Sequence, residues 1–232
     1  MSKSIQAFLL LLCFTCGLQA QLDLQLLYNF DDDNEFLTST VEYFGLDAYG
    51  RTYFFIDMNY NGDNVEGVSN AYGEFHRAFN ISDDLPIGLH FEYDGGLGQY
   101  NTPEGDQAYT INSSYLTGLD FYWLSEDFSK ALTLSTLYKY IQGKTDSSFQ
   151  ITLVWFANFF EGQLTVNGFA DFWKEENTFN DVVEDYVFLS QPQFWYNVTE
   201  NWAAGSEIQV GYNFGGEKGW DIWPTVAVKA TF

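Results

Sequence analysis

Two histidines and two glutamates stand at matched spacing on either side of a turn, and they are the residues best suited to chemistry. Glu74 and His76 precede the turn, whereas His90 and Glu92 follow it. A hairpin centred near Asp83 would place His76 opposite His90, and Glu74 opposite Glu92, with all four side chains on one face. Two imidazoles and two carboxylates can bind a divalent metal ion, form a charged hydrogen-bond network, or make a constriction that responds to pH. We assign no metal and no cofactor from the sequence, because the cluster depends on an assumed strand register.

The segments that hold these residues alternate between polar and apolar side chains, which is typical of β-strands with one wet face. Most segments are about ten residues long, the length that a tilted strand needs to cross a bilayer. The pattern predicts an all-β chain with about twelve antiparallel strands that run up and down. The expected strands are 22–30, 36–45, 52–61, 69–79, 86–95, 111–124, 131–141, 148–158, 163–173, 186–198, 203–214 and 221–232.

The last expected strand, DIWPTVAVKATF, has a clear alternation and an aromatic end. Every second residue back from Phe232 is apolar, and the other register is mostly polar. Outer-membrane β-barrels commonly end in this way, because the last strand pairs with the first and leaves no open edge in lipid. We expect Phe232 to be an assembly signal at the periplasmic rim, read by the barrel-assembly machinery. Lys229 should face the lumen with a carboxylate such as Asp23 as partner, and Pro224 should lie near the outer end.

The N-terminal segment is typical of a secretory signal. Lys3 is followed by the apolar run AFLLLLCFTCGL and by small residues up to Ala20, and the run is too short for a transmembrane helix. We expect residues 1–20 to be a signal peptide and 21–232 to be one barrel domain. Cys13 and Cys16 lie in the signal, so the mature barrel would have neither disulfides nor thiolate ligands.

The net charge and the connections between strands limit which partners the chain can bind. The formal net charge is −23, which argues against nucleic-acid binding because phosphates would be repelled. Short connections alternate with acidic, sometimes longer ones at 31–35, 62–67, 96–107 and 174–185, as expected for a periplasmic and an outer face. Acidic outer loops could bind the divalent cations that bridge lipopolysaccharide phosphates, although a solvated loop is the simpler interpretation.

The two registers of the strands predict a lipid face and a lumen. The apolar register includes Leu24, Ile56, Leu89, Leu134 and Ile151, with Tyr, Trp and Phe towards the strand ends. The opposite register includes Asp23, Asp57, Asp94, Asp120 and Gln150. A soluble β-sandwich also alternates, but it would have to bury its apolar face against a second sheet. The signal, the terminal Phe and the interface aromatics favour the barrel.

The expected lumen combines aromatic rings with carboxylates. Twelve strands enclose a narrow path, and no connection is long enough to form a plug. Rings can stack on a base, while carboxylates accept hydrogen bonds from hydroxyls and amines and repel phosphates. This predicts passage of nucleosides or other neutral or cationic solutes; the alternative is that the rings only fill space. The channel-lining and substrate candidates are Glu42, Phe44, Tyr53, Phe55, Asp57, Tyr72, Glu74, His76, His90, Glu92, Asp120, Phe169, Asp171, Trp173, Trp195, Glu207 and Lys229.

The stretch FLTSTVEYFGLDAYGRTYFFIDMNYN, residues 36–61, resembles outer-membrane proteins grouped with the Tsx-like, nucleoside-specific channel-forming family. LDLQLLYNF, LHFEYDGGLG and VAVKATF are similar to the same pattern. The resemblance implies a twelve-stranded barrel that passes nucleosides through a narrow lumen of aromatic and ionisable residues. No substrate-contacting residue of that family matches a position here, so no role is carried over.

We therefore expect a passive channel in the outer membrane of a Gram-negative bacterium, with no enzymatic activity. Its partners would be membrane lipid, lipopolysaccharide, the assembly machinery and a small solute. A closed structural or ligand-binding barrel is the alternative, favoured if Phe169, Trp173 and Trp195 block the pore. A lipid-modifying enzyme would need a serine–histidine pair at the lipid face, whereas His76 and His90 both fall in the wet register.

Overall fold

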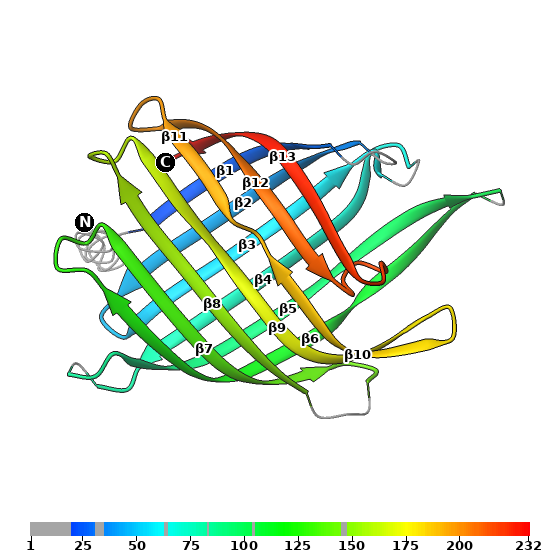
Figure 1. The fold of residues 1–232 in the computed structure, drawn as a ribbon, viewed down its shortest axis with the longest axis horizontal. Helices are drawn as coiled ribbons and strands as arrows, with labels where there is room; N and C mark the ends of the chain where they lie inside the picture. The colour runs from blue at the N-terminus through cyan, green and yellow to red at the C-terminus, as the bar shows by residue number, and fades with distance from the viewer. Residues whose placement is uncertain (1–19, 31–34, 63–64, 83, 104, 145–147) are drawn as a thin grey trace, which may run out of the picture.

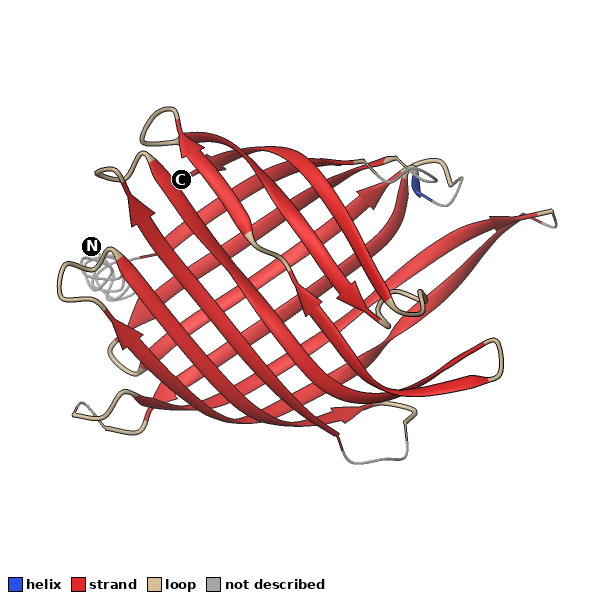
Figure 2. Ribbon diagram, in the orientation of Figure 1, coloured by secondary structure: helices blue, strands red, loops and turns tan. Residues whose placement is uncertain are grey.

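The computed structural model describes residues 20–30, 35–62, 65–82, 84–103, 105–144 and 148–232. Apart from Ala20, the expected signal peptide lies outside these residues, as do parts of the loops expected at 31–35 and 62–67. Strands make up most of the described chain (Figure 2). Within the described ranges, no helix is long and apolar enough to cross a membrane.

Antiparallel pairing joins the strands in the order of the sequence, so the chain runs up and down around one sheet. Most strands begin or end within a few residues of the predicted bounds, because the period-two pattern marks them well. The strands are β1 (Ala20–Asn29), β2 (Phe36–Asp47), β3 (Gly50–Tyr60), β4 (Val68–Asn80), β5 (Ile87–Thr102), β6 (Gly105–Leu124), β7 (Lys130–Ile141), β8 (Ser148–Phe159), β9 (Leu164–Phe179), β10 (Val182–Ser190), β11 (Gln193–Asn197), β12 (Trp202–Tyr212) and β13 (Trp220–Thr231).

The sheet closes on itself because β1 pairs with β13 as well as with β2 (Figure 1). The β1–β13 ladder runs from the pair of Asp23 with Thr231 to the pair of Asn29 with Thr225. Closure gives the backbone groups of both terminal strands a hydrogen-bond partner, which lipid cannot supply. The predicted antiparallel up-and-down β-barrel is therefore confirmed.

The barrel has twelve strands in its wall because β10 and β11 are two halves of one strand. Both halves pair with β9 on one side and with β12 on the other. Gln191 and Pro192 separate them, since proline has no N–H to donate to the ladder. The prediction of one unbroken strand at 186–198 is wrong in this respect. The Pro192 carbonyl still accepts the Ile208 N–H at 3.0 Å, which keeps the wall continuous.

Short turns and extended hairpins lie at opposite rims (Figure 1). The sequence pattern predicts loops at 96–107 and 174–185, and this prediction is wrong, because strand pairing continues through most of both segments. The β5–β6 hairpin pairs as far as Thr102 and Gly105 and extends beyond its neighbours. Its tip is held by the Thr102 hydroxyl, which donates to the Gly105 carbonyl at 2.7 Å.

The polarity of the barrel is the reverse of that of a soluble domain. On the outer face, the apolar side chains of Leu24, Leu134 and Ile151 are 39–42% exposed. Inside, Asp23 and Asp120 are only 2% exposed. An apolar outer surface is costly in water and favourable in lipid, so the predicted lipid-facing register is confirmed.

Leu134→Arg tests this assignment of the lipid face. Leu134 lies in the middle of β7, opposite Phe121 of β6 and Leu153 of β8. A cation near the bilayer midplane should lower the free energy of unfolding by about 2–4 kcal/mol, measured by denaturant titration in lipid vesicles. Tyr49→Arg, in the exposed β2–β3 turn, should cost about 0–1 kcal/mol. Equal losses for the two variants would contradict the assignment.

Candidate functional site in the barrel lumen

The lumen contains a cavity of about 190 Å³, and most of the predicted channel-lining residues border it. Tyr72, Trp173, Trp195 and Lys229 do not line this cavity. Contact of any of the candidates with a solute stays a prediction. The candidates that line the cavity are Glu42, Phe44, Tyr53, Phe55, Asp57, Glu74, His76, His90, Glu92, Asp120, Phe169, Asp171 and Glu207.

The β4–β5 hairpin carries both histidines, and its register differs from the predicted one. Asn80 pairs with Gly88, so the hairpin is centred near Asp84 instead of Asp83. The Ile81 N–H donates to the Ile87 carbonyl at 3.1 Å and closes the turn at this length. Because the strands run in opposite directions, moving the centre by one residue moves every partner by two.

The shifted centre changes which side chains lie opposite each other. His76 pairs with Glu92, and His90 pairs with Ala78. The predicted pairs of His76 with His90 and of Glu74 with Glu92 are therefore wrong. A shift of two residues keeps every side chain on its face, so all four still line one cavity.

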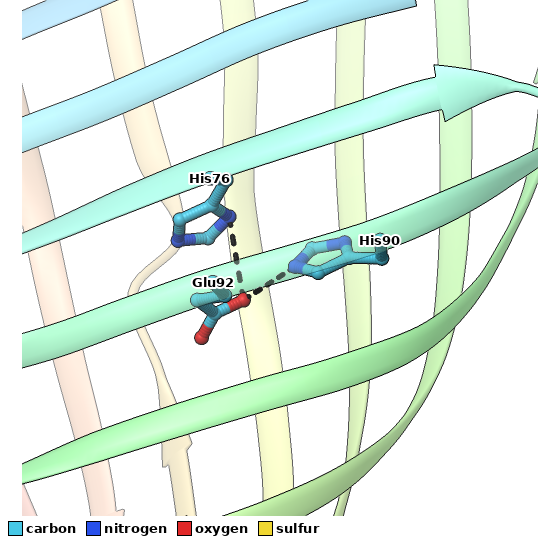
Figure 3. Close-up of side chains that lie close together, drawn as sticks. All are labelled: His76, His90 and Glu92. Atoms are coloured by element: carbon cyan, nitrogen blue, oxygen red, sulfur yellow. Dashed lines mark hydrogen bonds and ion pairs between the residues drawn. The ribbon is translucent and has the colours of Figure 1, made fainter.

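The two imidazoles meet at one carboxylate oxygen (Figure 3). His90 Nε2 lies 2.8 Å from Glu92 Oε2, and His76 Nδ1 lies 3.5 Å from the same atom. The second nitrogen of each ring contacts another carboxylate: His76 Nε2 is 3.0 Å from Glu74 Oε2, and His90 Nδ1 is 2.8 Å from Asp120 Oδ1. Carboxylates and imidazoles thus alternate across β4, β5 and β6. We call these five residues the histidine cluster.

Asp120 anchors the histidine cluster to the barrel wall. Arg51 Nη2 donates to Asp120 Oδ2 at 2.7 Å, and the Ser135 hydroxyl donates to Asp120 Oδ1 at 2.6 Å. The Arg51 guanidinium also lies over the Tyr122 ring, 4.6 Å from its centroid. Charge-assisted hydrogen bonds are short and strong, so Asp120 holds one orientation and in turn orients the His90 ring.

Small neighbours leave space for the His90 side chain on the inner wall. Ala78 of β4 and Gly118 of β6 are its two cross-strand partners. A Cβ at Gly118 would lie 2.1 Å from the Thr136 carbonyl oxygen, so β6 and β7 could not approach as they do with a larger residue there. Gly118 therefore allows β6 and β7 to approach closely next to His90.

Aromatic rings and carboxylates lie side by side on the wall formed by β2, β3 and β4. The ring centroids of Tyr53 and Phe55 are 6.1 Å apart, and those of Phe55 and Tyr72 are 6.0 Å apart. The Tyr53 hydroxyl donates to Glu42 at 3.2 Å, and Asp57 lines the same cavity. This wall offers ring faces and hydrogen-bond acceptors together, which suits a flat solute with donor groups.

Trp195 lies against the barrel wall and does not line the cavity. It is 0% exposed, and a Cβ at Gly205 would lie 2.6 Å from its ring, so the indole packs directly on the wall. Lys229 Nζ lies 4.4 Å from the centroid of the Trp195 ring. Lys229 Nζ is also 3.8 Å from Asp23 Oδ2, the partner that the sequence indicated.

The list of channel-lining candidates omits four ionisable residues of the lumen, Asp23, Arg51, Asp94 and Lys139, although Asp23 and Asp94 fall in the predicted polar register. Arg51 stands one position before the expected strand 52–61, so an error in a strand boundary hid it. Lys139 falls in the polar register of its strand, and alternation alone could have identified it; its Nζ lies 4.6 Å from the Trp173 ring centroid. Asp94 is 4% exposed, and its Oδ1 has no hydrogen-bond partner among the described residues.

Phe232 lies at the rim that carries the short turns (Figure 1). Its N–H donates to the Leu22 carbonyl at 2.9 Å, and its side chain is 73% exposed. The geometry thus extends the closing ladder to this residue. Its role as an assembly signal stays a prediction.

A closed antiparallel barrel with an apolar exterior and an ion-lined interior is an outer-membrane β-barrel. The protein is located in the bacterial outer membrane, where lipid matches its outer face. The chain belongs to the family described as Domain of unknown function (DUF5020), which matches residues 17–232. No curated protein has a detectably similar sequence.

Solved porin structures share the fold. The NanC porin superposes with a TM-score of 0.55 at 9% identity, over 90% of this chain and 98% of that chain. The KdgM porin gives a TM-score of 0.53 at 10% identity, over 91% of this chain and 99% of that chain. KdgM in complex with disordered oligogalacturonate gives 0.50 at 11% identity, with the same coverage. Identities this low show the fold alone.

Asp120→Asn tests the anchoring role of this carboxylate. The change removes the charge that pairs with Arg51 and His90, so the free energy of unfolding should fall by about 1–3 kcal/mol in vesicle unfolding experiments. Asp171→Asn is the matched control. Asp171 is also a buried lumenal carboxylate, but its Oδ1 has no hydrogen-bond partner among the described residues. We expect no loss for the control, and equal losses would show that Asp120 is not an anchor.

Proposed function

We propose that the protein is a passive outer-membrane channel for small neutral or cationic solutes, and that nucleosides are the solute class that fits best. The observation that carries the proposal is the cavity wall, where Tyr53 and Phe55 lie beside Glu42 and Asp57. Aromatic faces stack on any base, and carboxylates accept hydrogen bonds from ribose hydroxyls and exocyclic amines.

The charge of the lumen supports cations and neutral solutes over anions. Among the described residues, carboxylates outnumber arginine and lysine on the inner wall three to one, and the two histidines would not balance them. Anions would therefore meet a repulsive potential in a narrow, low-dielectric path. The inward acidic residues are Asp23, Glu42, Asp57, Glu74, Glu92, Asp94, Asp120, Asp171 and Glu207, and the inward cations are Arg51, Lys139 and Lys229.

The porin fold by itself does not determine which solute passes through the channel. KdgM was solved in complex with oligogalacturonate, a polyanion. The acidic lumen described above would repel such a chain of carboxylates, so we propose a different cargo for this protein. The resemblance of residues 36–61 to Tsx-like channels points to nucleosides, and the same charge argument disfavours nucleotides.

We also propose that the barrel is not an enzyme. His76 and His90 contact carboxylates, and neither bonds to a serine among the described residues, so the pair needed for a serine hydrolase is missing there. Lipopolysaccharide and the barrel-assembly machinery stay proposed partners, suggested by the acidic outer connections and by Phe232.

Ion selectivity in a planar bilayer tests the charge argument. Under a salt gradient, the reversal potential should show that cations pass in preference to anions. Neutralising three lumenal carboxylates, with Glu42→Gln, Asp57→Asn and Glu207→Gln together, should reduce this preference. The control removes three exposed charges from the short turns, with Glu126→Gln, Glu161→Gln and Glu200→Gln, and should change it little. Anion preference in the unaltered protein would contradict the proposal.

Solute block of the ion current tests the nucleoside assignment. Adenosine or thymidine should reduce the single-channel current, whereas adenosine monophosphate should have little effect. Phe55→Leu should weaken the block by roughly 5–150-fold, because a ring–base stack contributes about 1–3 kcal/mol. Phe54→Leu, the same change on the adjacent lipid-facing residue, is the control and should leave the block intact. Current that nucleosides do not alter would refute the assignment, and absence of current would favour the closed barrel.

A further inference from the structure

The histidine cluster has a geometry that one proton per ring does not satisfy. Each imidazole lies between two carboxylates, and both rings direct one nitrogen at the same oxygen, Glu92 Oε2 (Figure 3). A neutral imidazole has one N–H and one lone pair. The nitrogen that carries the lone pair would then face a carboxylate oxygen. This contact is repulsive unless a second proton, which makes the ring an imidazolium, or a metal ion lies between the two atoms.

The outer carboxylates orient the rings as metal-binding histidines are oriented. His90 Nδ1 is 2.8 Å from Asp120, and His76 Nε2 is 3.0 Å from Glu74. When these nitrogens carry the protons, His90 Nε2 and His76 Nδ1 present their lone pairs to Glu92. Carboxylate–histidine–metal arrangements of this kind fix the tautomer and make the ligand nitrogen more basic. The Tyr72 hydroxyl donates to Glu74 at 2.8 Å and holds that carboxylate in turn.

An excess of carboxylates surrounds the same point. Glu74, His76, Glu92 and Asp94 also form a group whose potential ligand atoms lie within 4.8 Å of one another. Asp94 is buried, and its Oδ1 has no hydrogen-bond partner among the described residues. A buried oxygen without a donor is costly, so this second observation independently points to a cation at the cluster.

We propose that His76, His90 and Glu92 bind one divalent transition-metal ion of the zinc class inside the lumen. Ligand atoms of a tetrahedral zinc ion lie about 3.3–3.4 Å apart, given bonds of about 2.0–2.1 Å. The contact of His76 Nδ1 with Glu92 Oε2 is already 3.5 Å, and that of His90 Nε2 would open from 2.8 Å by about half an ångström. All three residues line the cavity, so the ion can enter from the lumen and keep a fourth position for water or a solute.

The ligand chemistry distinguishes this ion from calcium and magnesium. Imidazole nitrogen suits zinc, cobalt, nickel and copper, whereas calcium and magnesium take oxygen ligands. The site does not depend on the proposed transport, because it requires only the folded barrel.

Cobalt binding to the purified, untagged barrel in detergent is the test. The sequence contains only two histidines, so histidine-dependent binding reports this site. We expect Co²⁺ to bind at one equivalent with visible absorption bands, and Zn²⁺ to displace it while excess Mg²⁺ and Ca²⁺ do not. Absence of saturable binding, or displacement by Mg²⁺ as effective as by Zn²⁺, would overturn the proposal.

Two sets of variants place the ion at the cluster. His76→Gln with His90→Gln should abolish the absorption bands, and Asp120→Asn should weaken binding about 10–100-fold by releasing the His90 ring. Glu161→Gln removes an exposed carboxylate from the β8–β9 turn, outside the lumen, and it should bind Co²⁺ like the unaltered protein. Circular dichroism confirms the fold of each variant before titration. Unchanged binding in a folded double histidine variant would refute the site.

Discussion

The need to satisfy every backbone hydrogen bond within lipid is the constraint on which the rest of this structure depends. An unpaired N–H in a bilayer costs several kcal/mol, so a sheet can cross only if it closes. The β1–β13 ladder provides the closure, and the N–H of Phe232 extends it to the Leu22 carbonyl. Where a proline lacks the N–H that a strand would donate, other groups make hydrogen bonds across the wall. At Pro192 the carbonyl still accepts from β12, and next to Pro224 the Thr225 hydroxyl accepts the Glu207 N–H at 2.9 Å.

Closure in lipid moves the polar half of every strand into the interior, and this creates a second problem. Buried charges are costly unless they are paired, and they are too numerous here to pair simply. The wall meets part of the demand with the ion pair of Arg51 and Asp120 and with Lys229 near Asp23 and the Trp195 ring. The remaining excess of carboxylate is the basis of the cation preference that we propose for the lumen. The acidic character of the lumen thus follows from the position of the barrel in lipid, because the polar side chains must face inward.

The same architecture occurs in the NanC and KdgM porins at 9–11% identity, so the barrel tolerates nearly complete replacement of its side chains. Solute preference must then come from the inner wall of each protein and not from the fold. In this chain the inner wall combines aromatic rings, acidic groups and a histidine cluster. We propose that this wall repels an anionic sugar chain and accepts a nucleoside.

Strand periodicity determined the fold and the two faces without any structure, because lipid and lumen select side chains at alternate positions. It therefore identified the lumenal position of Glu92, His90 and most of the cavity wall. The contacts of the histidine cluster were decided only by the tertiary structure. The β4–β5 turn is centred one residue later than expected, which pairs His76 with Glu92. The separate register of β5 with β6 places Asp120 on the other side of His90. A period of two is unchanged by a shift of two residues, so no alternation pattern can report that register.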